Sequence, residues 1–346
     1  MTSVFAIETS CDDTSVWLVD LYDWNIISKK LKSYSQIKEH LGFWWVVPEI
    51  ASRLHNEKII SLISSVWIDA IKSSEFISVT AKPGLPWSLL VWKTAANFLW
   101  EFFWKKVIYE NHIHWHIFSI FLDRNIKDIS LPAVFLTASW WHNDVYVLTD
   151  KSYDESFYEW IFSRTKLNNG LELIHIWKTI DDAAWECFDK VSKMLWWPYP
   201  WWPWISEMAK KWTYNEDYYI KPVYLNKNEF NFSFSWFKSK IFYLLKEIKD
   251  SNLVLDESII SDIAFSFQES VIKVLSKKLI SAWKKYNAKA LCIVWGVSSN
   301  DRLYEYLDLY IREKSLDFEL FRPAKKVYST DNASMIAAAS LFKNFL

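Results

Sequence analysis

Residues 4–20, VFAIETSCDDTSVWLVD, contain the pattern that decides the fold: an apolar strand, a polar loop and a second apolar strand. The apolar runs at 4–7 and 16–19 predict two buried strands, and the loop 9–14 between them offers hydroxyl, thiol and carboxylate groups. Residues 133–150, AVFLTASWWHNDVYVLTD, repeat the pattern. Two copies in one chain predict a duplicated architecture of two domains, with each polar loop facing a central cleft.

Helices and further strands are predicted around these two copies. We expect helices at 48–72, 89–103, 181–194, 256–278 and from residue 333 onward, and strands at 76–80 and 290–294. Alternating strands and helices are typical of the α/β class. The 346 residues exceed the size of one compact core, which again favours two domains.

Bulk composition excludes several classes of protein. The net charge of −1 shows no global signature of nucleic-acid binding, and we interpret the lysine clusters as solvated faces. Three scattered cysteines fit a reducing compartment. The early carboxylate of Glu8 argues against a signal peptide, and charges within the apolar stretch 85–104 argue against a membrane span. We expect a cytoplasmic protein that does not associate with a membrane.

Tryptophan and glycine occur in unusual proportions. The chain has 24 tryptophans and four glycines, whereas glycine makes up about 7% of ordinary chains. Tryptophan doublets at 44–45, 140–141 and 201–202 occupy loops where glycine would allow positive φ. The two types together make up about 8% of the chain. We therefore predict that many of these tryptophans are glycines in the cell, encoded by UGA codons. The alternative is a tryptophan-rich protein with aromatic ligand platforms.

A histidine cluster is a candidate metal site. His112 and His116 have i, i+4 spacing, which places both imidazoles on one face of a helix, and His114 between them points elsewhere. The alternative is an ordinary surface or core pair. Ile113 stands where the metalloprotease pattern H-E-x-x-H needs glutamate, so the pair does not match that pattern.

Asp331 is the best candidate for a third ligand. Two histidines and one carboxylate with open positions suit iron or zinc. Asp331 also directly precedes the predicted C-terminal helix, where it or Asn332 could cap the first turn. From the residues alone, both roles stay open.

Three loops would become rich in exposed amides if tryptophan stands for glycine. They lie at 139–142, 200–203 and 295–300. Such loops can cradle phosphates, so together they favour a nucleotide-like ligand. Asp189 is placed to bind ribose hydroxyls or, alternatively, to form a surface ion pair with a neighbouring lysine.

Taken together, these segments resemble the universal tRNA threonylcarbamoyladenosine-modifying transferase family, once described as an O-sialoglycoprotein endopeptidase. The resemblance extends from Phe5 to about Phe342. Wherever a family motif contains glycine, this chain has at least one tryptophan at a glycine position. The motifs are ETSCDDT (8–14), FWWVVPE (43–49) with ASR-x-H (51–55), NHIHWH (111–116), ASWWH (138–142), IDDAAWE (180–186) with FDK (188–190), FSFSWFK (232–238), WGVSSN (295–300) and TDN (330–332).

The resemblance implies a fold and a reaction. The fold is the actin-like ATPase (ASKHA) fold, with an N-terminal domain at 1–128, a C-terminal domain at 129–322 and a segment at 323–346 that returns toward the cleft. The implied acyltransferase moves threonylcarbamoyl from threonylcarbamoyl-AMP to the N6 amine of the adenosine 3′ of the anticodon, in tRNAs that read ANN codons. The implied partners are tRNA, an actin-fold partner subunit and a small ATPase subunit.

Two other functions are considered. A non-catalytic partner subunit of the same complex would have the same fold but would need no metal site. A metallopeptidase would need a glutamate beside the histidine pair, which this sequence lacks.

The resemblance also implies roles for particular residues. His112, His116 and Asp331 match the family's ligands for one divalent metal, for which we expect Fe2+ with Zn2+ as the alternative. Asp12 is the candidate proton acceptor. His114 and Lys82 depart from the family's glutamate and glycine, and 151–176 has no recognisable role. The positions that match contacts to the adenylate are Thr137, Ala138, Ser139, Trp140, Trp141, Asp189, Trp202 and Asn300.

Overall fold

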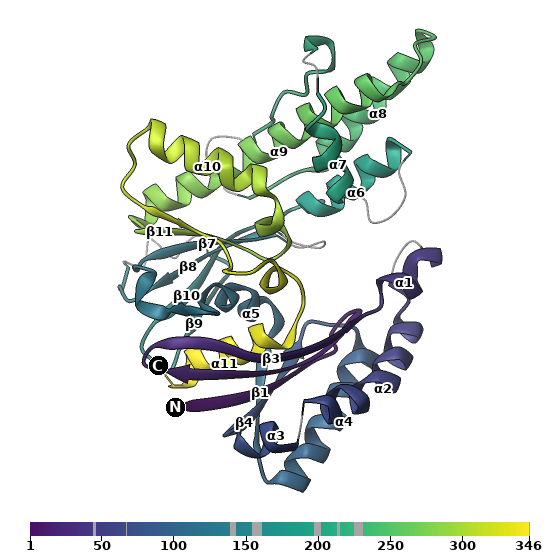
Figure 1. Cartoon of the computed structure of the whole chain (residues 1–346). Coiled ribbons are helices and arrows are strands. Elements are labelled where there is room, and N and C mark those ends of the chain that lie inside the picture. Colours follow the sequence, from purple (N-terminus) through teal and green to yellow (C-terminus); the bar gives the residue numbers. More distant parts are fainter. Residues whose placement is uncertain are drawn as a thin grey trace. The chain divides into compact units, whose positions relative to one another are not determined.

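The structure, a computed structural model, divides into two compact units (Figure 1). Unit 1 comprises Met1–Ser130, Lys166–Leu171 and Phe321–Leu346, and unit 2 comprises Leu131–Thr165 and Glu172–Leu320. The C-terminal segment therefore belongs to the same unit as the N-terminus. The residues that the structure describes are 1–43, 46–66, 68–138, 143–153, 161–196, 202–212, 215–224 and 231–345.

Unit 1 contains a six-stranded mixed sheet in the order β5-β4-β1-β2-β3-β6. β1 is antiparallel to β2 and parallel to β4, which is parallel to β5. The loop between β1 and β2 is the predicted polar loop. The strands are β1 (Thr2–Glu8), β2 (Asp13–Tyr22), β3 (Asn25–Ser35), β4 (Phe76–Lys82), β5 (Lys106–Asn111) and β6 (Arg124–Asn125).

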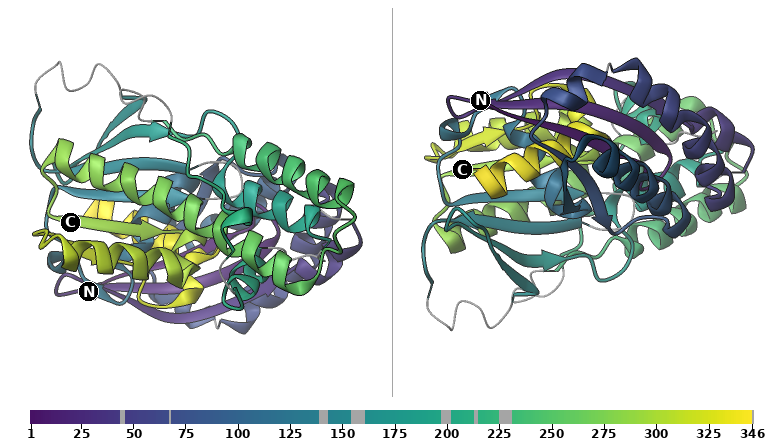
Figure 2. Two further views of the ribbon diagram at one scale, coloured as in Figure 1. Left: turned by 90° about the horizontal axis from the view of Figure 1, so that it is seen from above. Right: turned by 90° about the horizontal axis from the view of Figure 1, so that it is seen from below.

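Helices cover both faces of this sheet. Phe5 and Ile7 of β1 share a buried apolar cluster with Trp92 and Ala96 of α4, which packs beside α2 (Figure 2). α11 packs against β1, β2 and α5, and it is buried from Ala333 to Phe342. A central strand with both faces covered is expected to carry a continuous apolar run, as β1 does at residues 4–7. The helices are α1 (Ile37–His40), α2 (Pro48–Ser65), α3 (Ile68–Ser73), α4 (Pro86–Phe103), α5 (His112–Phe118) and α11 (Ala333–Phe345).

Unit 2 is built around a second six-stranded sheet, in the order β12-β11-β7-β8-β10-β9. β7 (Ala133–Ala138) is antiparallel to β8 (Asn143–Thr149) and parallel to β11 (Ala290–Val294). Helices α9 and α10 lie side by side over this sheet (Figure 2, left). The other elements are β9 (Ser163–Lys166), β10 (Glu172–Lys178), β12 (Glu319–Phe321), α6 (Ala184–Met194), α7 (Trp202–Ala209), α8 (Ser235–Asp250), α9 (Glu257–Tyr286) and α10 (Asp301–Glu313).

The two sheets have the same plan. Each sheet contains an antiparallel hairpin, β1-β2 or β7-β8. The first strand of the hairpin also pairs with a parallel strand, β4 or β11, which comes after helices in the sequence. The predicted α/β class and duplication are thereby confirmed, and the plan is that of the actin-like ATPase fold. The helix predicted at 48–72 is two helices, α2 and α3. Within the described residues, no helix is both long enough and apolar enough to cross a bilayer.

Among the described residues, four tryptophans have a left-handed backbone conformation. The φ angles are 63° at Trp24, 56° at Trp104, 64° at Trp196 and 67° at Trp295. This conformation costs a residue with a Cβ about 1–2 kcal/mol. Trp104 directly follows α4, a position where glycine is common, and its side chain is 86% exposed. Little packing is therefore available there to offset the strain.

Candidate metal centre

The histidine pair is set by the start of α5. Asn111 ends β5, and its Oδ1 accepts hydrogen bonds from the backbone N–H of Ile113 at 2.9 Å and of His114 at 3.3 Å. This cap starts the helix at His112, so His112 and His116 lie one turn apart on the same face. Their Nε2 atoms are 3.2 Å apart. The prediction that both imidazoles lie on one face of a helix is therefore confirmed.

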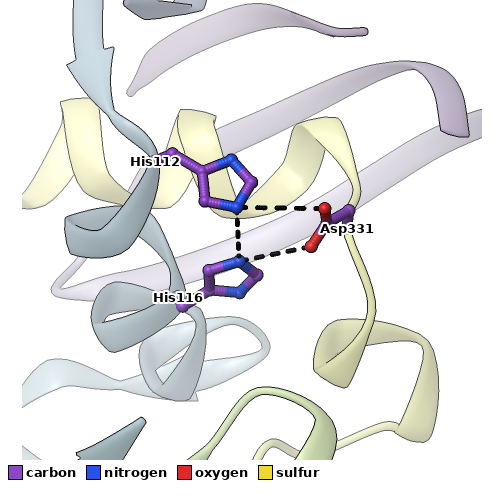
Figure 3. A group of neighbouring side chains, drawn as sticks. All are labelled: His112, His116 and Asp331. Atoms are coloured by element: carbon purple, nitrogen blue, oxygen red, sulfur yellow. Dashed lines mark hydrogen bonds and ion pairs between the residues drawn. The ribbon is translucent and has the colours of Figure 1, made fainter. Parts of the chain in front are cut away.

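Asp331 faces this pair from the segment before α11 (Figure 3). Its Oδ1 lies 3.2 Å from Nε2 of His116, and its Oδ2 lies 3.9 Å from Nε2 of His112. Asn332 caps α11 instead, because its Oδ1 accepts the backbone N–H of Ser334 at 3.0 Å. Of the two roles left open by the sequence, capping therefore belongs to Asn332, and the Asp331 carboxylate is directed at the histidines.

The chemistry of this donor set suits a divalent cation. The three ligand atoms lie within 4.8 Å of one another; atoms bound to one ion at about 2.1 Å would lie about 3.0–3.4 Å apart. Burial lowers the pKa of His112 to about 3 and holds the pKa of His116 well below its usual value. Both imidazoles are therefore neutral at pH 7, which is the form that binds metals. Two histidines and one carboxylate could hold Fe2+ or Zn2+.

His114 lies outside this group. Its Nδ1 is 3.3 Å from Nζ of Lys343 on α11, and Lys343 also binds Oε2 of the buried Glu110 at 2.5 Å. The expectation that His114 points away from the pair is confirmed. Among the described residues, the metal-type group consists of His112, His116 and Asp331. Replacing the family's glutamate by His114 therefore links α5 to α11 and does not add a ligand to this group. The other departure, Lys82, ends β4 in the ladder opposite Asn111.

The loop between β1 and β2 places carboxylates near Asp331. The pKa of Asp12 is raised by burial and then by the negative charge of Asp331. Burial and the charge of Asp12 raise the pKa of Asp13 to about 7. Glu8 at the end of β1 is fully buried, and burial followed by the charge of Asp331 raises its pKa to about 8. Burial is the main cause of all three shifts, and a cation at the centre would offset the remaining repulsion by Asp331 and Asp12.

His55 of α2 holds this loop in place. Its Nε2 donates to the backbone O of Cys11 at 2.9 Å, and its Nδ1 accepts from Oγ1 of Thr14 at 2.7 Å. Burial lowers the pKa of His55, which favours the neutral form that this pattern needs. No role for His55 was predicted, although it belongs to the motif ASR-x-H. The contacts of His55 join segments that are distant in sequence, so the spacing of neighbouring residues could not have predicted them.

The described candidates for substrate contacts lie in unit 2. Thr137 and Ala138 end β7 and are buried. Asn300 caps α10, because its Oδ1 accepts from the backbone N–H of Leu303 at 3.2 Å. Trp202 begins α7. Ser139, Trp140 and Trp141 lie outside the described residues.

Asp189 lies on α6 and is 4% exposed. The nearby Lys190 binds Asp182 at 3.1 Å and Glu186 at 2.5 Å. Both roles considered for Asp189, contact to ribose hydroxyls and an ion pair with a neighbouring lysine, stay predictions. On the same helix, Trp185 fills the space beside Gly296, where a Cβ would lie 2.4 Å from the indole nitrogen.

Comparisons with known proteins agree on one family. The sequence model for tRNA N6-adenosine threonylcarbamoyltransferase (TsaD) matches residues 25–159 and 167–338. A protein of that name from Endomicrobium trichonymphae is 36% identical over 351 residues, which cover 99% of this chain and 92% of the relative. Another from Phytoplasma australiense is 34% identical, covering 99% and 94%.

Solved structures support the fold. Full-length HypF in its phosphate- and nucleotide-bound form matches 98% of this chain with a TM-score of 0.54 and 12% identity. T. kodakarensis HypF matches 99% with a TM-score of 0.55 and 11% identity. The chain spans about half of these two HypF chains, 54% and 47% respectively. At such low identity the likeness concerns the fold alone.

Proposed function

The chain belongs to the tRNA N6-adenosine threonylcarbamoyltransferase family, and from this premise we propose that it transfers threonylcarbamoyl from threonylcarbamoyl-AMP to the adenosine 3′ of the anticodon in tRNAs that read ANN codons. It is an acyltransferase that acts on tRNA. The observation that carries the proposal is the convergence of His112, His116 and Asp331 within a chain that matches the family over nearly its whole length. A non-catalytic partner subunit would have no use for this group.

In this proposal His112, His116 and Asp331 hold one divalent cation. Two neutral imidazoles and a single carboxylate leave coordination positions open, an arrangement that favours Fe2+, with Zn2+ as the alternative. When bound, the ion supplies Lewis-acid polarisation of a substrate oxygen. Asp331 also provides negative charge close to the two uncharged imidazoles.

Residues of unit 2 bind and orient the adenylate. We assign this role to Thr137, Ala138, Asp189, Trp202 and Asn300, together with the loop residues Ser139, Trp140 and Trp141. The N6 amine forms a bond to the carbamoyl carbon, the bond from that carbon to the phosphate oxygen breaks, and AMP leaves with the electron pair. The amine loses a proton, for which Asp12 is the candidate acceptor because its raised pKa makes it a stronger base. Positioning contributes much of the rate.

Many tryptophans of the chain are, we infer, glycines in the natural protein. The left-handed conformations of Trp24, Trp104, Trp196 and Trp295 support this inference independently of composition. UGA codons at these positions, with glycine found by peptide mass spectrometry of the natural protein, are the expected result. UGG codons with tryptophan in the peptides would overturn it.

The proposed partners are an actin-fold subunit and a small ATPase subunit, in the cytoplasm. An exposed apolar face on α4 supports a protein partner: Phe98 and Phe102 stack with ring centroids 5.8 Å apart and are 63% and 65% exposed. Trp87 and Leu90 of the same helix are also exposed. The domains proposed are 1–128 and 129–322, followed by the segment 323–346.

A reconstituted tRNA-modification assay tests the function. His112→Ala and Asp331→Ala are expected to abolish formation of threonylcarbamoyladenosine, and Asp69→Asn on the exposed side of α3 is the control. Wild-type activity in the His112→Ala Asp331→Ala double variant would remove this centre from the mechanism.

A further inference from the structure

We propose that Glu8 and Ser10 are positioning residues that fix the tautomer and orientation of His112. The inference rests on the proposed function, because it concerns how His112 is presented to the centre formed with His116 and Asp331. Neither Glu8 nor Ser10 belongs to that group of three. Both act through His112 and do not touch the proposed cation.

The hydroxyl of Ser10 lies between two partners. Its Oγ is hydrogen-bonded to Oε1 of Glu8, and it lies 3.1 Å from Nδ1 of His112. A carboxylate only accepts hydrogen bonds, and a serine hydroxyl has one proton. When that proton is donated to Glu8, the Ser10 oxygen must accept from Nδ1–H of His112. The lone pair of the imidazole is then on Nε2, the atom that faces Asp331 and His116.

The carboxylate of Glu8 is held by two further donors. The backbone N–H of Ser10 donates to Oε1 at 2.6 Å, and the hydroxyl of Thr80 donates to Oε2. Glu8 ends β1, and Thr80 lies on the neighbouring strand β4, so rigid elements fix both ends of the carboxylate. Glu8, Ser10 and Thr80 are all fully buried. Because the backbone N–H of Ser10 also donates to Oε1, a proton bound by Glu8, whose pKa is raised to about 8, is placed on Oε2 beside Thr80. Oε1 stays an acceptor, which leaves the Ser10 hydroxyl with a single direction for its proton.

Gly84 supports Ser10 from the other side. A Cβ at Gly84 would lie 2.9 Å from both Cβ and the backbone O of Ser10, and the backbone N–H of Leu85 donates to that same oxygen at 2.8 Å. The segment after β4 therefore packs closely against Ser10. A side chain at position 84 would move Ser10 without removing its hydroxyl.

The alternative is a purely structural role, in which Glu8 and Ser10 only satisfy each other's hydrogen-bonding groups in the core. The two roles differ in their effect on His112. A structural role predicts that loss of the Ser10 hydroxyl lowers stability alone. A positioning role predicts that the imidazole of His112 changes tautomer and that the centre loses affinity for a cation.

Nitrogen NMR of metal-free, 15N-histidine-labelled full-length protein at pH 7.5 tests this directly. We expect His112 to carry its proton on Nδ1 in the wild type and to shift toward Nε2–H in Ser10→Ala. Ser78→Ala is the matched control, because Ser78 is an equally buried serine whose hydroxyl bonds to Ser340, outside this chain of contacts. A wild-type His112 protonated on Nε2 would overturn the proposal, even if Ser10→Ala fails to fold.

Zn2+ titration against a chromophoric chelator provides the second readout. Ser10→Ala is expected to bind Zn2+ about 10–100-fold more weakly than the wild type, while Ser78→Ala binds as the wild type does. Equal affinity in the wild type and Ser10→Ala would overturn the proposal. A wild type that binds neither Zn2+ nor Fe2+ would instead overturn the proposed metal centre, and the tautomer measurement would still decide the positioning role.

Discussion

Asn332 accepts the backbone N–H of Ser334 at 3.0 Å, so the cap of α11 is filled by the residue next to Asp331. The two neighbours therefore have separable tasks. Asn332 starts the helix, and Asp331 faces the histidine pair.

Substitutions at these two positions are expected to have different effects. Asn332→Ala should cost about 1 kcal/mol of unfolding free energy through loss of the cap, with little change in Zn2+ affinity. Asp331→Ala should remove Zn2+ binding and leave the metal-free protein at least as stable, because Asp331 repels Glu8 and Asp12. Urea unfolding and chelator competition measure the two quantities, and equal loss of affinity in both variants would contradict the separation.

Acid should destabilise the metal-free protein through its buried histidines. The pKa of His112 is lowered to about 3 and that of His116 also falls, whereas an unfolded histidine titrates near 6.5. Between these values the unfolded chain binds more protons, so the unfolding free energy should fall as pH drops from 6.5 toward 3. Urea unfolding with chelator present measures this slope, and His112→Gln His116→Gln should reduce it. An unchanged slope in that variant would assign the acid sensitivity to other groups.

His114 and Lys343 should affect stability and leave the metal centre intact. Lys343→Met leaves the Glu110 carboxylate buried without its ion-pair partner, and breaking such pairs costs about 3–5 kcal/mol. His114→Ala removes only a longer contact and should cost less. Both variants should bind Zn2+ as the wild type does. A large loss of affinity in His114→Ala would show that the third histidine is a ligand.

Glycine should stabilise the protein where tryptophan is in the left-handed region. In protein produced with tryptophan at every UGA or UGG codon, Trp104→Gly and Trp196→Gly are each expected to gain about 1 kcal/mol. Trp100→Gly is the control, because it lies inside α4 and should lose about 1 kcal/mol of helix propensity. Thermal and urea unfolding measure whether each substitution raises or lowers the free energy of unfolding. Destabilisation by Trp104→Gly would contradict the conformational argument.

Local patterns were sufficient for much of the fold. The runs 4–7 of β1, 133–136 of β7 and 290–294 of β11 are buried and apolar, so they stand out as continuous hydrophobic segments, whereas β4 also contains Ser78 and Thr80. Strand β3, NIISKKLKSYS, was not predicted because its lysines interrupt that signal. Strands β5 and β10 and helices α8 and α10 were also not predicted. The domain boundaries stay a prediction.

The candidate site was predictable only in part, for a similar reason. The spacing of His112 and His116 is local, so a helix alone brings them together. The role of Asp331 depends on whether Asp331 or Asn332 caps the first turn of α11. The spacing of residues in the sequence does not decide between them. Ser10, which is bonded to Glu8, meets His112 only after β1, β4 and β5 have paired, so this contact is a property of the sheet.

Unit 1 includes helix α11, which follows unit 2 in the sequence, and this has a consequence for biosynthesis. α11 packs against β1 and β2 of the first sheet, yet α11 is synthesised after all of unit 2. Unit 2 can therefore fold before α11 has been synthesised, whereas unit 1 needs α11 and long-range contacts that form slowly. Asp331 arrives with that segment. A chain synthesised only as far as unit 2 has the histidines but lacks the carboxylate, so the centre can assemble only after residues 321–346 have been made.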